Sequence, residues 1–124
     1  MTQKILLYAG ALLPVIWGVA HLFPTRSVVE DFGEISEDNR RIITMEWIIE
    51  GVALIFIGVI VAAATMIDHT GVLARTICWI SIVMLNVLSV ISLQTGFKIK
   101  FLPFKLCPVI FTSSSVLILL GLLL

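Results

Sequence analysis

The chain has 124 residues, of which 60% are hydrophobic and 13% are charged, and its mean hydropathy is +1.15. A soluble domain is about half apolar and about a quarter charged, and a chain this short has too little interior to bury the excess. The composition therefore excludes an ordinary soluble protein and indicates an integral membrane protein. A formal net charge of zero, without a long basic run, gives no sign of a nucleic-acid partner.

Four apolar segments are long enough to cross the membrane as helices, because about 30 Å of hydrocarbon takes about 20 helical residues. They are residues 5–23, 45–67, 72–95 and 104–124. The connections "DHTG" and "TGFKIKFLPF" are short, so the helices that they join should be antiparallel neighbours. The sequence thus predicts an all-α fold, a four-helix transmembrane bundle that forms a single integral membrane domain.

The polar stretch between the first two apolar segments, residues 24–44, should lie at the membrane surface. Pro24 suits the first turn of a short helix, and Gly33 suits its end. Ser36 is a good N-cap for the next helix, with acidic residues in the first turn after it. We therefore expect a short interfacial helix, followed by a long helix that stands above the membrane before it enters.

The Lys and Arg residues near the helix ends predict the orientation. One end carries Arg26, Arg40, Arg41, Lys98, Lys100 and Lys105, and the other carries Lys4 and Arg75. Because basic residues concentrate on the cytoplasmic side, we place the first end in the cytoplasm. The protein should then be a multi-pass protein of the cytoplasmic (inner) membrane with both termini outside.

Polar side chains from several helices fall at one depth. At 1.5 Å per residue, His21 and Glu50 lie about 10 Å from the middle of their spans, on the cytoplasmic side. Asn86 and Ser89 lie about 5 to 10 Å from the middle on the same side, and Glu46 lies one turn closer to the interface. A charge in hydrocarbon is costly, so Glu50 should face the bundle interior and pair with His21. Asn86 and Ser89 would complete the hydrogen bonds.

The first helix carries two further features at this level. Trp17 lies one turn before His21 on the same face, and Pro14 should bend the helix. A bend opposite polar groups would open a small cavity between helices, which is where bundles bind ligands. The Glu-x-x-His pairs of di-iron bundles are absent, so we expect no metal site, and no cofactor can be named.

Two interpretations of these polar groups remain open. In a functional pocket, His21 and Glu50 would act as an acid–base or ligand-polarising pair. The ligand contacts would come from Trp17, Glu46, Asn86 and Ser89. In a structural cluster, the same groups would only fix helix packing, with Glu46 paired to a nearby arginine. Trp47 is expected at the interface in both cases.

The first two helices resemble those of the DoxX-like families, which are small four-helix membrane proteins. The run "EWIIEGVALIFIGVIVAA" is similar to their helix signature, in which a glutamate and a glycine precede apolar sequence that ends in a second glycine. Glu50, Gly51 and Gly58 would be those positions. The phrase "WGVAHLFP" is similar to their glycine and histidine before a proline. The resemblance implies a four-helix fold and a group whose members are associated with quinone-linked sulfur oxidation or are uncharacterised.

We expect a pocket that opens toward the cytoplasmic leaflet and binds a small apolar molecule such as a quinone, an isoprenoid or another lipid. One alternative is an accessory or assembly subunit of a larger membrane complex, which would purify with its partner. Another is a homo-oligomeric channel or carrier, although a path across the membrane would need ionisable groups at more than one depth. The sequence leaves open whether the protein is an enzyme.

Overall fold

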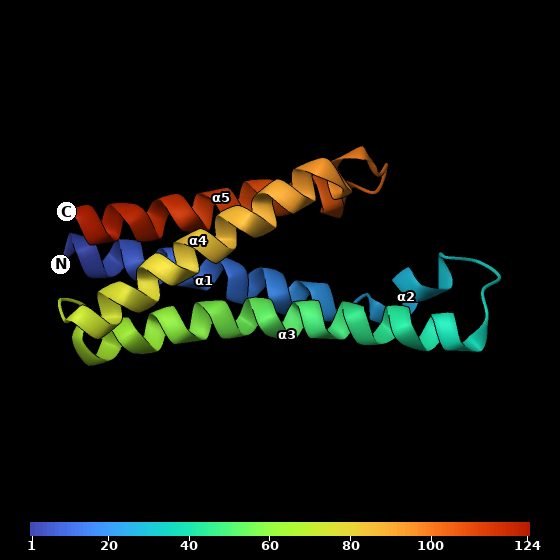
Figure 1. The fold of residues 1–124 in the computed structure, drawn as a ribbon, viewed down its shortest axis with the longest axis horizontal. Coiled ribbons are helices and arrows are strands. Elements are labelled where there is room, and N and C mark those ends of the chain that lie inside the picture. The colour runs from blue at the N-terminus through green and yellow to red at the C-terminus, as the bar shows by residue number, and fades with distance from the viewer.

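A computed structural model describes all 124 residues, and the fold is entirely helical (Figure 1). The elements in chain order are α1 (Thr2–Leu22), α2 (Thr25–Glu30), α3 (Glu37–Asp68), α4 (Val72–Gln94), the 3-10 helix η1 (Gly96–Lys98) and α5 (Leu102–Leu123). The helices α1, α3, α4 and α5 are long and apolar enough to cross a membrane. The predicted fold class is confirmed, and the chain is a multi-pass integral membrane protein.

The four long helices form a bundle in which α1 lies between α3 and α5, and α4 packs along α5. Both termini lie at one end of the bundle, while α2 and η1 lie toward the other (Figure 1). The helix α4 runs obliquely and diverges from α3 toward η1 (Figure 1). The expected antiparallel pair of α3 and α4 is therefore only partly packed, and an apolar groove of about 340 Å³ lies between them.

Glycines let α1 and α3 pack backbone against backbone. A Cβ atom added to Gly18 would lie 2.6 Å from the carbonyl oxygen of Gly51, and one added to Gly58 would collide with the carbonyl oxygen of Ala11. Small residues at helix contacts are the usual means of close approach in membranes, where association depends on van der Waals packing. This contact holds the last turns of α1 firmly against α3.

The segment between α1 and α3 is built as its sequence predicts. Residues Val28 and Val29 of α2 are buried, and Gly33, with a φ of 75°, lies just beyond the end of that helix. The hydroxyl oxygen of Ser36 then accepts a hydrogen bond from the backbone N–H of Asn39 at 3.2 Å and caps α3. The first turns of α3 extend past the ends of α4 and α5 (Figure 1).

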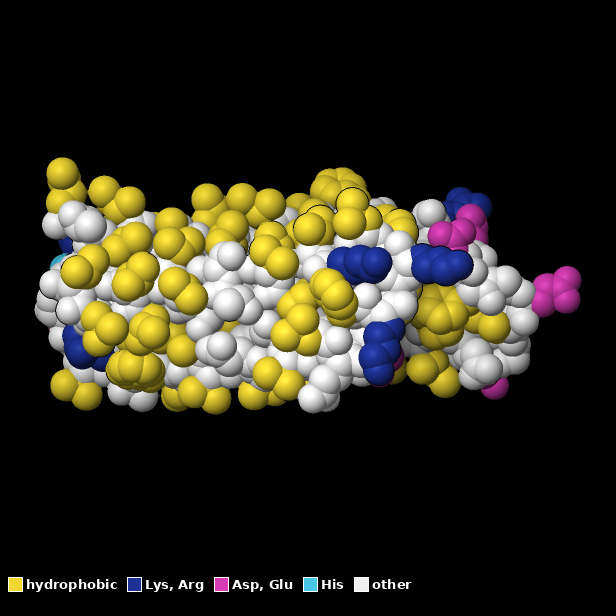
Figure 2. Space-filling model, turned by 90° about the horizontal axis from the view of Figure 1, so that it is seen from above, with side chains coloured by type: hydrophobic (Ala, Val, Ile, Leu, Met, Phe, Trp, Pro, Cys, Tyr) yellow, Lys and Arg dark blue, Asp and Glu magenta, His cyan; other side chains and the backbone are white.

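The outer surface is apolar along the whole bundle, as a lipid-facing surface should be. Large exposed hydrophobic side chains occur on every long helix, and Figure 2 shows hydrophobic side chains spread along the whole length of one face. The interior contains a single cluster of buried apolar residues from the four long helices. Buried hydroxyls join the helices inside it, as where Ser114 donates to the carbonyl of Gly10 at 2.6 Å. Such bonds contribute on the order of 1 kcal/mol each in membranes.

Candidate functional site

The last turn of α1 brings His21 to Glu50 of α3. The imidazole Nε2 lies 3.4 Å from the carboxylate Oε2, so the predicted meeting of these two groups is confirmed. The His21 side chain is 6% exposed, whereas that of Glu50 is 48% exposed. The expectation that Glu50 faces the bundle interior is therefore wrong. Because Gly51 faces α1 directly, Glu50, one residue earlier and about 100° around the helix, lies at the edge of the contact.

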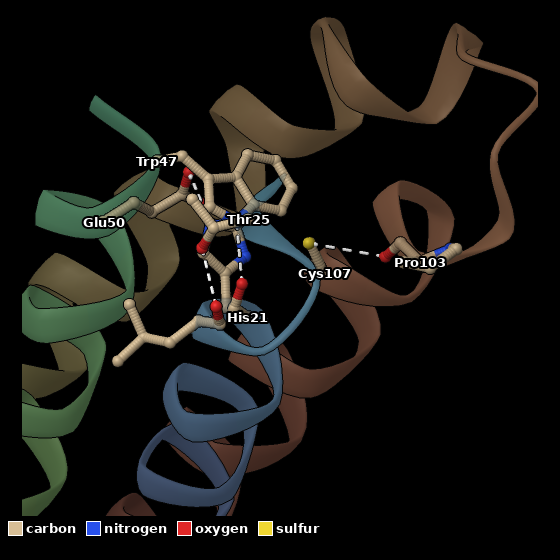
Figure 3. A network of polar contacts seen from close by, with 7 residues as sticks. His21, Thr25, Trp47, Glu50, Pro103 and Cys107 are labelled. Carbon is tan, nitrogen blue, oxygen red and sulfur yellow. Dashed lines mark hydrogen bonds and ion pairs between the residues drawn. The ribbon is translucent and has the colours of Figure 1, made fainter. Parts of the chain in front are cut away.

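Trp47 joins the same two helices one turn before Glu50 (Figure 3). Its indole Nε1 donates a hydrogen bond of 2.7 Å to the backbone carbonyl of His21. Its ring stacks on the imidazole, with centroids 3.8 Å apart and planes 14° from parallel. The carbonyls of the last helical turn have no partner within the helix. Trp47 satisfies one of them, and the hydroxyl of Thr25 satisfies the next by donating to Leu22 at 2.6 Å.

A cavity of about 160 Å³ lies beside this contact, between α1, α3 and the start of α5. Its lining is mainly aromatic, apolar and proline side chains: Trp17, Ala20, His21, Pro24, Trp47, Phe101, Pro103, Phe104 and Cys107. The ring of Phe104 meets Trp47 edge-on at 5.8 Å, and Phe101 meets Phe104 in the same way at 5.8 Å. These contacts fix the start of α5 against the end of α1.

Two side chains that line the cavity each carry a buried nitrogen without a hydrogen-bond partner. These nitrogens are Nε1 of Trp17 and Nε2 of His21. The Glu50 carboxylate is close to Nε2, but the contact lacks the geometry of a hydrogen bond. A buried donor without a partner costs about 1–3 kcal/mol, so native proteins rarely keep one without a reason. An indole N–H can only donate, and the sulfur of Cys107 beside that of Trp17 is a weak acceptor, so a stronger acceptor within the cavity would satisfy the indole better.

The other predicted contacts lie elsewhere. Asn86 donates to the hydroxyl of Ser115 at 2.7 Å, and the hydroxyl of Ser89 contacts that of Thr112 at 2.8 Å. Both side chains therefore join α4 to α5, and the expectation that they complete the hydrogen bonds of His21 and Glu50 is wrong. Two residues at similar depth meet only when their helix faces also turn toward each other.

Glu46 is exposed on α3 and forms no ion pair. The expected pairing with an arginine is wrong, because Arg41 instead donates to Glu37 at 3.1 Å, four residues earlier on the same helix. No group of three or more His, Cys, Asp or Glu side chains gathers anywhere in the chain closely enough to hold a metal ion. The thiol of Cys107 lines the cavity and contacts the carbonyl of Pro103 at 3.5 Å.

Sequence reasoning placed Trp17 and His21 in the site but missed the aromatic side chains opposite them. The signal for Trp47 is its position three residues before Glu50, which puts both on one face of α3. Phe101 and Phe104 follow no helical pattern that relates them to α1, so only the packed structure reveals their part in the cavity.

Against models of protein families, curated proteins and solved structures, the chain has no significant match. The resemblance of the first two helices to the DoxX-like families stays a prediction. Function must therefore be inferred from the geometry and chemistry of the cavity.

Proposed function

We propose that the cavity binds the ring of a small membrane-dissolved molecule, and that quinones are the class that fits it best. The observation that supports this is that Trp17 and His21, two side chains that line an aromatic cavity, each carry an unpartnered buried nitrogen. A quinone ring carries carbonyl oxygens, which are acceptors for such groups. A ring without oxygen would leave both nitrogens unsatisfied.

Size and shape agree with a single ring. A dry protein cavity of about 150 Å³ accommodates benzene, and this cavity has about 160 Å³. Aromatic side chains stack with or meet a flat ring edge-on, which contributes about 0.5–1.5 kcal/mol per pair beyond the buried area. An isoprenoid tail would then lie outside the cavity, among the exposed apolar side chains of the bundle. The resemblance to the DoxX-like families points to the same ligand class.

His21 and Glu50 give the cavity a route for protons. Glu50 is half exposed, and we propose that its carboxyl reaches water near the membrane surface and exchanges protons with it, whereas His21 is buried and lines the cavity. An imidazole can accept a proton at one nitrogen and release one from the other. The pair would therefore exchange a proton with the hydroxyl of a bound quinol, the reduced form of the ring, whereas the carbonyl of a quinone would only accept a hydrogen bond from His21. This is general acid–base chemistry with His21 as the group nearest the ligand.

Binding can be measured by tryptophan fluorescence, because Trp17 and Trp47 line the cavity and a quinone quenches them. The exposed Trp79 of α4 is first replaced by Phe to remove its signal. A short-chain ubiquinone with one isoprenyl group should then quench to saturation. Because each variant removes one donor and keeps an aromatic ring, W17F and H21F should each weaken binding about fivefold to tenfold.

The matched control is N86A, which removes a polar side chain from the contact between α4 and α5 instead of from the cavity. It should bind the short-chain ubiquinone with unchanged affinity. The proposal is wrong if W17F and H21F both bind as tightly as the parent, or if quenching never saturates. If an isoprenyl chain without the ring binds as tightly as the short-chain ubiquinone, the ligand is an isoprenoid and not a quinone.

We also propose that α2 and η1 lie on the cytoplasmic side of the inner membrane. The basic residues gather at this end of the bundle, and both termini lie at the other end (Figure 1). The proton route through Glu50 would then open toward the cytoplasm. Labelling of a single cysteine at position 3, in a variant with Cys78 and Cys107 replaced by alanine, should succeed from outside the cell and fail from inside.

A further inference from the structure

The connection between α4 and α5 is strongly basic and amphipathic. We call residues 95–106 the basic hairpin; it contains Lys98, Lys100 and Lys105 and the exposed side chains of Phe97, Ile99, Phe101, Leu102 and Leu106. Lysines and apolar residues alternate over 97–101. No Asp or Glu occurs after Asp68, so this half of the chain supplies no negative charge to balance them.

The lysines of the basic hairpin have no carboxylate partner anywhere in the chain. The three ion pairs of the protein involve His21, Arg26 and Arg41. Each of the two arginines is paired with a glutamate four residues away on its own helix, and so is already balanced. The only close partner of a hairpin lysine is aromatic, since Nζ of Lys105 lies 6.0 Å from the ring centroid of Phe97.

The basic hairpin lies where two spans leave the hydrocarbon. It joins the ends of α4 and α5, short of the outermost part formed by α2 and the start of α3 (Figure 1). Figure 2 shows Lys and Arg side chains gathered toward this end, next to apolar side chains, with acidic side chains farther out. Phenylalanine rings at this depth reach the acyl chains, while lysine amines reach the headgroups.

We propose that the basic hairpin binds the headgroups of anionic phospholipids. Three unbalanced ammonium groups match the phosphate-bearing, negatively charged surface of a leaflet rich in such lipids, and the alternating apolar side chains anchor the hairpin beneath them. The paired arginines contribute little, because their charge is already neutralised by neighbouring glutamates. The hairpin shares Phe101, Pro103 and Phe104 with the cavity lining, but its three lysines do not line the cavity, so their binding of lipid does not depend on the proposed quinone.

Native mass spectrometry of the full chain, from micelles with equal phosphatidylglycerol and phosphatidylcholine, tests the proposal. The parent should carry phosphatidylglycerol preferentially. Each lysine near an anionic surface changes binding about fivefold, so K98Q/K100Q/K105Q should lose about a hundredfold in this preference. Because exposed charges are screened within about 3 Å at 1 M ionic strength, salt should lower the preference of the parent as well.

The control variant R26Q/E30Q/E37Q/R41Q removes two positive charges from the same end of the molecule together with the two glutamates that neutralise them. It should keep the preference of the parent, whereas attraction by the number of positive charges alone would lower it. The proposal fails if the lysine variant keeps its preference while its melting temperature in dodecylmaltoside matches that of the parent. It also fails if R26Q/E30Q/E37Q/R41Q loses as much per positive charge removed as the lysine variant.

Discussion

Replacing Gly58 by alanine should separate α1 from α3 and destabilise the bundle. The new Cβ atom would overlap the backbone carbonyl oxygen of Ala11, which cannot rotate away as a side chain can. Overpacking of this kind costs about 1–3 kcal/mol, and the higher helix propensity of alanine returns up to about 1 kcal/mol. We therefore expect G58A to lower the free energy of unfolding by about 1–2 kcal/mol. Reversible unfolding in mixed dodecylmaltoside and dodecylsulfate micelles measures this.

The control is G96A at the start of η1, where an added Cβ would be in ordinary contact, 3.5 Å from the nearest atom of Phe104. This variant should unfold within about 0.5 kcal/mol of the parent, as substitutions without a named mechanism do. If G58A is as stable as the parent, α1 and α3 do not pack backbone to backbone. If G96A is equally destabilised, the loss in G58A is not specific to this contact.

Three further substitutions test single contacts. W47F keeps an aromatic ring beside His21 but loses the hydrogen bond to its carbonyl, so its free energy of unfolding in the same micelles should fall by about 1 kcal/mol. W47L loses the stacking as well, and its free energy of unfolding should fall by about 2 kcal/mol. S114A removes the buried donor to the carbonyl of Gly10 and should cost about 1 kcal/mol in that assay. S36A removes the N-cap of α3 and should cost about 1 kcal/mol of local stability, seen as faster hydrogen exchange at the N–H of Asn39 without a change in ligand binding.

Helix positions were predictable because bilayer thickness imposes a length on each apolar segment. The start of α3 was predictable for a local reason, since Ser36 and the acids after it satisfy the first turn of any helix. The divergence of α4 from α3 was not predictable. It depends on how side chains along α4 and α5 interlock, and the short turn between α3 and α4 constrains only their first contact.

The sequence could predict the membrane depth of the candidate site residues, but not the direction in which each side chain points from its helix. Residues His21 and Glu50 meet because equal depth and a glycine contact coincide. Asn86 has a similar depth but turns toward α5, and depth alone could not reveal this. The exposure of Glu50 was unpredictable for the same reason. It depends on the rotation of α3 about its own axis, which the contact of Gly51 and its neighbours with α1 fixes. Membrane helices contain too few polar residues for the sequence to show which face of each helix points into the bundle.

Photolabelling with an azidoquinone that carries one isoprenyl group tests the proposed binding of a ring most directly. The label, after proteolysis and peptide mass spectrometry, should lie on Trp47 or within residues 17–24 or 101–107, the segments that contain the lining of the cavity. An excess of unlabelled short-chain ubiquinone should prevent it, and W17F/H21F should lose most of it. Label in the apolar groove between α3 and α4, on Ile57 or Ile77, with none in the cavity peptides, would contradict the proposal.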